Sequence, residues 1–282
     1  MTFFSSNSVS RRGFLKVGAL AAASMSLPEL LSAAEQKKIP VGLQLYSLRA
    51  DAPKDLPKTI EAVAKMGYKG VEFAGYYDKK AAELRKLLDD NGLVCCGTHT
   101  PLETIQPDKL AATIEFNKTL GNKYLMVPYM DGKTKQGWLD LAKLFNEQVE
   151  KVKAEKMYLG YHAHGHDFNK IDGESCWDTF FGNTKDDVVM QLDTSNCMEG
   201  KANPVEVLKK YSKRAVTIHL KEWGGPSPDS VIGEGKVDFK SVFDICEKNG
   251  VTQWYVVEHE SGTKPLENVK GCIEALKKMG KA

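Results

Sequence analysis

Short apolar runs alternate with longer amphipathic segments along the chain after residue 40. The apolar runs have the length and composition of buried strands, at residues 41–46, 70–73, 93–98, 123–127, 157–162, 188–192, 215–220 and 254–258. The amphipathic segments predict helices at residues 55–66, 78–91, 107–120, 137–156, 176–181, 204–211, 238–249 and 265–279. Local signals support the boundaries: Pro57 lies in a first turn, Gly67 follows a helix end, and Asp78 is the expected cap of the second helix.

Eight strand–helix pairs in sequence predict a parallel sheet, because each helix carries the chain back to the start of the next strand. Eight such pairs most simply close into a single (β/α)8 TIM barrel. An open doubly wound sheet is the alternative, but no G-x-G-x-x-G motif follows an early strand. The sequence shows no linker or change of composition within residues 35–282, so we expect one domain there.

The first 34 residues predict an export signal rather than part of the fold. The segment Ser10-Arg11-Arg12-Gly13-Phe14-Leu15-Lys16 resembles a twin-arginine signal, and a weakly apolar stretch follows at residues 17–27. That stretch is too short to span a bilayer comfortably. Small residues at 32–34 predict cleavage after Ala34, which would make residues 35–282 a periplasmic protein. An amphipathic N-terminal helix is the alternative.

The net charge bears on the binding partners of the protein, and the cysteine spacing bears on its disulfides. The whole chain has 39 basic and 37 acidic residues, and residues 1–34 hold three of the basic and one of the acidic ones, which leaves 36 of each. A neutral mature chain argues against nucleic acid and against an anionic membrane surface as partners. The six cysteines show no C-x-x-C spacing, so we expect buried free thiols, with disulfides as the alternative. The sequence leaves the oligomeric state open.

Polar residues at the predicted strand ends are the candidate chemistry, because a barrel of this type has its active site at the carboxyl ends of its strands. Strands five to eight end with His162, Asp193, His219 and Glu258. Imidazole and carboxylate groups that converge in one place suit a divalent metal, either Mn, Co, Zn or Mg. Singly, each has another explanation: Asp193 could cap a turn, His219 could be a hydrogen-bonded core residue, and Glu258 could pair with Lys221.

Seven segments carry a resemblance to a known family. They are Gly42–Arg49, Gly70–Tyr76, Gly160–His164, Leu192–Asn196, His219–Glu222, Gly233–Phe239 and Val256–Glu258. In this order they resemble the sugar isomerase/epimerase group of the xylose isomerase-like barrels. The resemblance implies one divalent metal held by groups from strands five to eight, which coincides with the four residues above.

Two departures from the family pattern bear on the reaction. Ketose 3-epimerases of this superfamily have a glutamate on strand five where this chain has His162, and the Tyr161-His162-Ala163-His164 pattern is closer to the inosose dehydratase branch. The endonuclease IV branch has Asp-x-x-His on strand six, where this chain has Asp193 and then Asn196. The neutral charge and the export signal also argue against a DNA repair enzyme.

The chemistry we expect is metal-assisted enolisation of a keto sugar. Glu258 and His164 are the expected acid–base groups, with Glu260 and His99 as the respective alternatives. Lys221 is expected to act as an electrophile or to contact a substrate hydroxyl. A salt bridge between Lys221 and Glu222 is the alternative. Residues expected to contact the sugar are Tyr46, Glu72, His99, Asn196, Trp223 and Glu260. Reprotonation would give isomerisation or epimerisation, and loss of a β-hydroxyl would give dehydration.

We expect a free or glycosidic keto sugar without phosphate, because the chain has no phosphate-binding loop of the Walker type and periplasmic sugars generally lack phosphate. The loop from Trp223 to Lys236 is a possible lid. A metal-dependent hydrolase and a sugar-binding barrel without catalysis remain as alternative functions.

Overall fold

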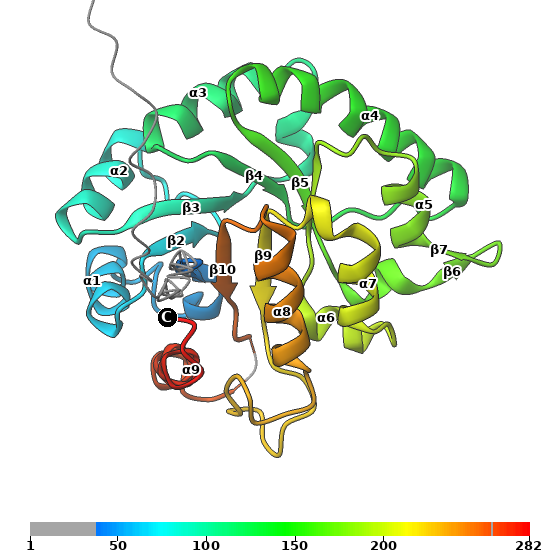
Figure 1. Cartoon of the computed structure of the whole chain (residues 1–282). Coiled ribbons are helices and arrows are strands. Elements are labelled where there is room, and N and C mark those ends of the chain that lie inside the picture. Colours follow the sequence, from blue (N-terminus) through cyan, green and yellow to red (C-terminus); the bar gives the residue numbers. More distant parts are fainter. Residues whose placement is uncertain (1–37, 261) are drawn as a thin grey trace, which may run out of the picture. The chain divides into compact units, whose positions relative to one another are not determined.

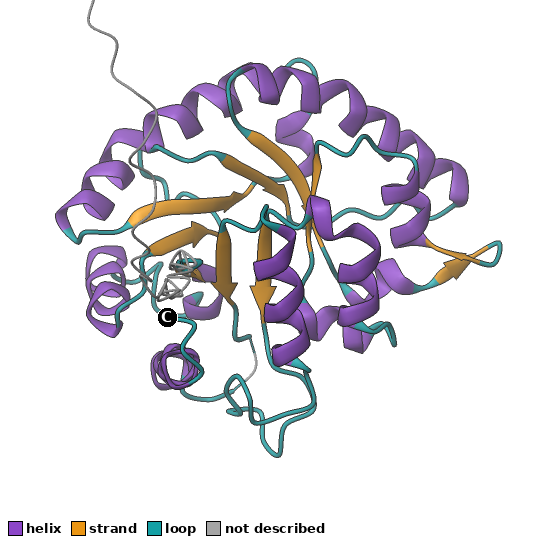
Figure 2. Ribbon diagram, viewed as in Figure 1, coloured by secondary structure: helices purple, strands orange, loops and turns teal. Residues whose placement is uncertain are grey.

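The computed structural model describes residues 38–260 and 262–282, so the predicted signal segment lies outside the described residues. Eight parallel strands form the central sheet of this part of the chain (Figures 1 and 2). They are β1 (Val41–Gln44), β2 (Gly70–Phe73), β3 (Val94–His99), β4 (Tyr124–Val127), β5 (Tyr158–His162), β8 (Val188–Gln191), β9 (Thr217–Leu220) and β10 (Trp254–Val257).

The strands are ordered β8-β5-β4-β3-β2-β1-β10-β9, and each neighbouring pair in this order is parallel. The two ends of this order meet just beyond β8, where Asp193 forms a parallel bridge with His219 and the His219 N–H donates to Leu192 O at 2.9 Å. The sheet is therefore a nearly closed (β/α)8 barrel, which confirms the fold predicted from the sequence.

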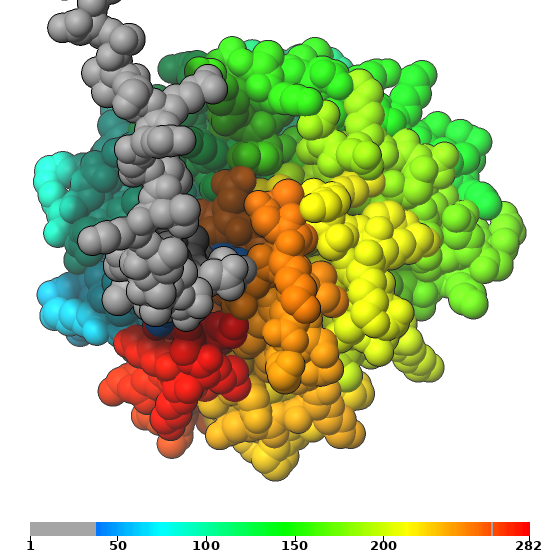
Figure 3. All heavy atoms as spheres, viewed as in Figure 1, coloured from blue at the N-terminus to red at the C-terminus, as the bar shows by residue number. Residues whose placement is uncertain are grey.

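Helices surround the sheet (Figure 2). They are α1 (Leu56–Met66), α2 (Ala81–Asp90), α3 (Leu110–Leu120), α4 (Lys135–Ala154), α5 (Cys176–Gly182), α6 (Thr194–Glu199), α7 (Pro204–Tyr211), α8 (Phe239–Asn249) and α9 (Pro265–Lys278). Their apolar faces and the outward faces of the strands make the main core. The α7 and α8 helices pack side by side and leave no visible gap on the face seen in Figure 3.

Four features differ from the sequence-based expectations. The first strand ends at Gln44, and Tyr46 belongs to a 3-10 helix (Leu45–Leu48). Asp78 does not cap α2: it has a positive φ of 55°, and Glu83 instead accepts from the Lys80 N–H at 2.8 Å. Two elements were not predicted, the hairpin of β6 (Lys170–Ile171) with β7 (Glu174–Ser175) and the helix α6. These differences concern element ends and short elements, which depend on tertiary contacts.

A bulge between β2 and β3 makes room for a buried carboxylate. Val71 pairs with Cys95, but the next residue, Glu72, pairs with Gly97, so Cys96 is the extra residue. A Cβ at Gly97 would collide with the Glu72 carboxylate, so only glycine allows this side chain to turn into the barrel. The bulge thus sets the position of Glu72.

All six cysteines are buried and free, as expected from the sequence. Among the described helices, none has both the length and the apolar character that crossing a bilayer requires.

A buried aspartate organises the turn after β5. Asp167 has no exposed surface, and its carboxylate accepts from the Tyr161 hydroxyl and from the His164 backbone N–H, both at 2.7 Å. These bonds hold the 3-10 turn Gly165–Phe168, which begins directly after His164. Burial raises the pKa of Asp167 from 3.8 to about 7, and Asp131 adds to the rise, while His166 and the two hydrogen bonds oppose it.

The Asp167→Asn variant tests this contribution to stability. Because the folded pKa of Asp167 is raised, the folded state holds this proton more tightly, and that stabilisation is complete below about pH 4 and lost as the pH rises through about 7. We expect the stability of the parent protein relative to the variant to fall between pH 5 and pH 8, as measured by urea unfolding at both pH values. A difference that does not change with pH would contradict the assignment.

Candidate active site

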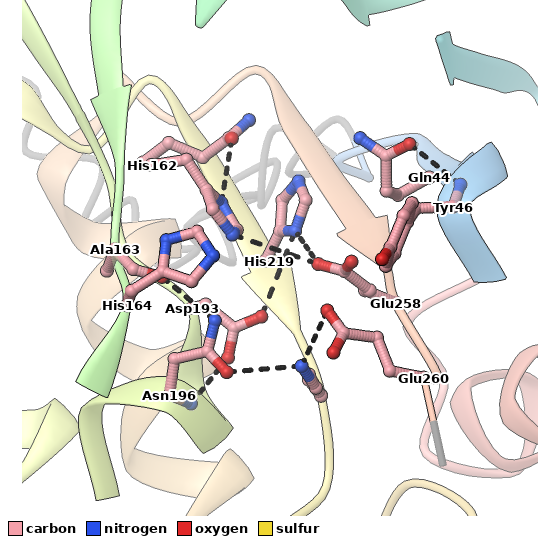
Figure 4. Close-up of polar contacts among 12 residues, drawn as sticks. Gln44, Tyr46, His162, Ala163, His164, Asp193, Asn196, His219, Glu258 and Glu260 are labelled. Atoms are coloured by element: carbon pink, nitrogen blue, oxygen red, sulfur yellow. Dashed lines mark hydrogen bonds and ion pairs between the residues drawn. The ribbon is translucent and has the colours of Figure 1, made fainter. Parts of the chain in front are cut away.

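Four ionisable side chains meet where β5, β8, β9 and β10 end. His162 is the last residue of β5, Asp193 follows β8 by two residues, His219 lies in β9, and Glu258 follows β10. One donor atom from each lies within 4.8 Å of the others, and each residue is at most 2% exposed. Figure 4 shows them facing one another. The structure thus brings together the four residues that the sequence predicted as metal ligands.

His219 lies between two buried carboxylates. Its Nδ1 is 2.7 Å from Glu258 Oε2, and its Nε2 is 2.6 Å from Glu72 Oε1. Burial alone would lower the pKa of His219, but the charges of Glu72 and Glu258 and their hydrogen bonds raise it to about 10. Without a metal ion, the imidazole is therefore a cation that balances the two acids.

Glu72 anchors the ring of side chains below this cluster. Besides His219, its carboxylate accepts from Gln44 Nε2 and Gln191 Nε2, both at 2.9 Å, and lies 3.2 Å from His99 Nε2. Burial would raise the pKa of Glu72, but the charges of His219 and His99 hold it well below its usual range. Glu72 was predicted to contact the substrate, whereas in the structure it lies behind the cluster with no exposed surface.

Gln191 determines which nitrogen of His162 faces the cluster. Because the Gln191 amide NH2 donates to Glu72 and Thr217, its Oε1 is an acceptor, and it lies 3.1 Å from His162 Nδ1. Nδ1 must then carry the hydrogen, which leaves the lone pair on Nε2. Nε2 is 3.9 Å from Glu258 Oε2, too far for a hydrogen bond. Burial and the neighbouring His219 keep the pKa of His162 well below its usual value, so the ring is neutral.

Asp193 has two distinct carboxylate oxygens. Oδ1 accepts from the Asn196 N–H at 2.7 Å and caps α6, as one of the sequence interpretations had it. Oδ2 is buried without a hydrogen-bond partner and lies 3.9 Å from His219 Nδ1. Burial raises the pKa of Asp193 to about 6. A buried oxygen left unpaired costs about 1–3 kcal/mol, so the site favours an added positive charge.

A divalent cation fits these donors. Two atoms that each bind one ion at about 2.1 Å can be at most about 4.2 Å apart. The separations of 2.7 Å and 3.9 Å given above fall within that limit, and all four donor atoms lie within 4.8 Å of one another. The donor set would be His162 Nε2, Asp193 Oδ2, His219 Nδ1 and Glu258 Oε2, which mixes imidazole and carboxylate as Zn, Mn and Co sites do. Glu72 and Gln191, behind the two histidines, are placed to orient them.

Lys221 and Glu260 form an ion pair beside the cluster. Lys221 Nζ is 3.0 Å from Glu260 Oε1 and donates to Asn196 Oδ1 at 3.1 Å, and Asn196 in turn donates to Ala163 O (Figure 4). Lys221 therefore pairs neither with Glu222 nor with Glu258. Burial and the charge of Glu258 raise the pKa of Glu260 to about 7, although Lys221 opposes the rise.

Glu222 instead ties down the loop that follows. Its carboxylate accepts from the backbone N–H groups of Trp223, Gly233 and Val237. Further along, Asp229 accepts from Thr263 and Asn268. Trp223 is covered by Lys236, whose Nζ is 5.6 Å from the ring centre, and Trp223 is not among the residues that line the pocket described next. The segment predicted as a lid is thus a loop that is held by hydrogen bonds to Glu222 at its start and by hydrogen bonds between Asp229 and residues after β10.

A pocket of about 310 Å³ opens above the cluster. Its lining residues are Tyr46, Ala74, His99, Pro101, Pro128, Tyr129, His162, His164, Glu258 and Glu260. Four of the predicted residues therefore face it without belonging to the ligand set: Tyr46, His99, His164 and Glu260. Burial lowers the pKa of His164 to about 4, so this residue meets a ligand as a neutral imidazole.

Sequence reasoning missed Gln44, Gln191, Gly97 and Tyr129. The two glutamines each end an otherwise apolar strand, and a polar residue there is a usable signal. Gly97 and Tyr129 carry no such signal, because their roles come from residues distant in the sequence.

Known proteins share the sequence pattern and the fold of this chain. Residues 60–279 match the family described as "Xylose isomerase-like TIM barrel". An inosose dehydratase of Clostridium botulinum (strain Alaska E43 / Type E3) is 26% identical over 281 residues, which cover 82% of this chain and 93% of that protein.

Two solved structures show the same fold. A sugar phosphate isomerase/epimerase from Parabacteroides distasonis has a TM-score of 0.74 and 26% identity, covering 85% of this chain and 98% of the other. A structure of L-ribulose 3-epimerase has a TM-score of 0.65 and 18% identity, covering 86% and 94%. With a family match over most of its length and this barrel, the chain belongs to the xylose isomerase-like TIM barrel family.

Proposed function

We propose that this protein is a divalent-metal-dependent enzyme of the isomerase/epimerase type that removes the proton next to the carbonyl of an unphosphorylated keto sugar. The observation that carries the proposal is the cluster of His162, Asp193, His219 and Glu258. Two of its members, His162 and Glu258, line a pocket that also holds proton-carrying side chains. A non-catalytic binding barrel would have no use for this concentration of buried charge.

The four residues of the cluster would hold the cation, which would supply a Lewis acid for the sugar carbonyl. Glu72 keeps the Nε2 hydrogen of His219 engaged at 2.6 Å, so Nδ1 is the nitrogen that faces the cluster. Gln191 does the same for His162 through Nδ1. The histidines are therefore oriented before any ligand arrives.

Two proton carriers stand on different sides of the pocket. Glu260 follows β10 and His164 follows β5, and three steps around the barrel separate these strands. A carboxylate at Glu260 can take a proton from one face of a bound sugar, and Lys221 neutralises its charge in the resting state. His164, fixed through Asp167, can exchange a proton on the other face. A group on each face is what epimerisation requires.

Dehydration is the second candidate, and a specific observation favours it. Strand five ends in His162 rather than the glutamate expected of ketose 3-epimerases, and relatives of about 25% identity over most of their length are named inosose dehydratases. The same proton removal followed by loss of a β-hydroxyl would give that reaction, with His164 or His99 close enough to the pocket to assist the departing hydroxyl.

The composition of the pocket supports a sugar without phosphate. None of its ten lining residues is lysine or arginine, and Lys221 is already paired with Glu260. Phosphate groups in proteins are usually bound by such cations or by helix N-termini.

We also propose export to the periplasm. The support is the resemblance of residues 10–16 to a twin-arginine signal, with cleavage after Ala34.

Metal binding is the first test. The parent protein should contain about one divalent ion per chain by elemental analysis, and Asp193→Asn and His219→Ala should lower the affinity by more than about 100-fold, because each removes a donor. Asp186→Asn, the same exchange at an exposed residue before β8, is the control and should keep the ion. An ion-free parent protein that is not stabilised by added metals would contradict the proposal.

Glu72→Gln tests orientation separately from binding. The variant keeps the shape of the side chain but loses the carboxylate that holds His219, so we expect the metal affinity to fall by about 10–100-fold. The effect should be smaller than that of Asp193→Asn, as measured by competition with a chelator. An unchanged affinity would show that Glu72 does not orient the ligand.

Proton exchange tests the reaction. The metal-loaded protein, incubated in D2O with inosose and with ketohexoses, should exchange the proton next to the carbonyl, and the NMR spectrum should also reveal an epimer or a dehydrated product. Glu260→Gln and His164→Gln should each slow the exchange by about 100-fold or more while retaining the metal. If both variants exchange at the parental rate, these residues are not the proton carriers.

The proposed export predicts the mass of the mature protein. Its intact mass in the periplasmic fraction should correspond to residues 35–282, and replacing Arg11 and Arg12 by lysine should leave the uncut chain in the cytoplasm. A periplasmic protein that retains residues 1–34 would contradict the predicted cleavage site.

A further inference from the structure

Two exposed tyrosines stand at the mouth of the pocket. Tyr46 is 44% exposed and Tyr129 is 55% exposed, and both line the opening. In residues 38–260 and 262–282, the other large apolar side chains with this degree of exposure are aliphatic: Val94, Leu266 and Met279. Exposed aromatic rings are thus gathered at this opening, where they contribute little to the core.

The two rings are held in place rather than free. Arg49 lies over the Tyr46 ring at 4.7 Å and is itself fixed by bonds to Tyr46 O and Glu260 O. The Tyr129 ring contacts His164 edge-on at 5.5 Å and His166 at 4.9 Å. Each ring therefore has one side supported by the protein, and the remaining side is available to a ligand.

The tyrosines flank the opening from different directions. Tyr46 follows β1 and Tyr129 follows β4, and three steps around the barrel separate those strands. Deeper in the pocket, the walls are His99, His162 and Glu258. The polar interior and the aromatic entrance are thus two zones with different chemistry.

The size of the pocket limits what the interior can hold. A volume of about 310 Å³ is at the low end of the range of about 300–1,000 Å³ for small-molecule sites. Because Tyr46 and Tyr129 line this same volume, its inner part suits one sugar ring, and a second ring attached to it would lie between the tyrosines and extend outward. Flat aromatic faces suit the C–H faces of sugars, and they lose little conformational entropy on binding.

We propose that Tyr129, together with Tyr46, forms an outer subsite for a second sugar ring, so that the substrate class is a keto sugar that carries a glycosidic substituent. The inference rests on the proposed function, which assigns a keto sugar to the inner pocket. Tyr129 would determine specificity, because it contacts the substituent and not the reacting ring.

Binding of two matched probes to the metal-loaded protein tests the subsite. The probes are D-fructose and isomaltulose, which is the same ketose carrying a glucosyl ring, and their affinities are measured by calorimetry. We expect isomaltulose to bind at least about fivefold more tightly. Tyr129→Ala should abolish this preference, whereas Tyr129→Phe, which keeps the ring, should retain it.

Three results would overturn the subsite: equal affinities for the two probes, a preference that survives Tyr129→Ala, or binding of neither sugar. Because the readout is affinity, its outcome is separate from that of the proposed function. A protein that prefers isomaltulose through Tyr129 but exchanges no proton would keep the subsite and lose the enzymatic proposal. The metal content of each variant is measured as well. Substitution of Tyr129 should not change it, and an unchanged content shows that the inner site is intact.

Discussion

The position of His219 between Glu72 and Glu258 is the interaction on which the site depends. Both ring nitrogens are engaged by buried carboxylates at 2.6 and 2.7 Å, so the imidazole cannot rotate without leaving a charge unpaired. Glu72 is tied in turn to Gln44 and Gln191, and Gln191 to His162. The ligand cluster is therefore supported from below by side chains that have no contact with solvent.

His219 also takes part in closing the barrel, together with Asp193. The pairing of β8 with β9 is reduced to the bridge between Asp193 and His219, and the backbone around these residues is where the ends of the sheet meet. A cation bound by both side chains would join the two ends of the sheet, so metal binding and closure would stabilise each other. The bulge at Cys96 and the absence of a side chain at Gly97 add the space that Glu72 needs.

In the proposed function, chemistry and recognition are separated by depth in the pocket. The proposed metal ligands lie at the bottom, Glu260 and His164 stand to the sides, and the tyrosines stand at the entrance. Isomerisation and dehydration share the first proton removal and diverge only in which group receives the next proton. In the proposed mechanism, the placement of His164, which depends on the buried carboxylate of Asp167, would bear directly on the outcome of the reaction.

The sequence by itself determined the strand–helix alternation, the eight-fold barrel and the convergence of His162, Asp193, His219 and Glu258, because parallel strands must end on the same side of their sheet. It also indicated free cysteines. Tertiary structure alone decided that Glu72 lies beneath the ligands, that Lys221 pairs with Glu260, and that Tyr129 stands at the opening. Those relations join residues that are distant in the sequence through side-chain directions, bulges and loop paths, which local periodicity does not encode.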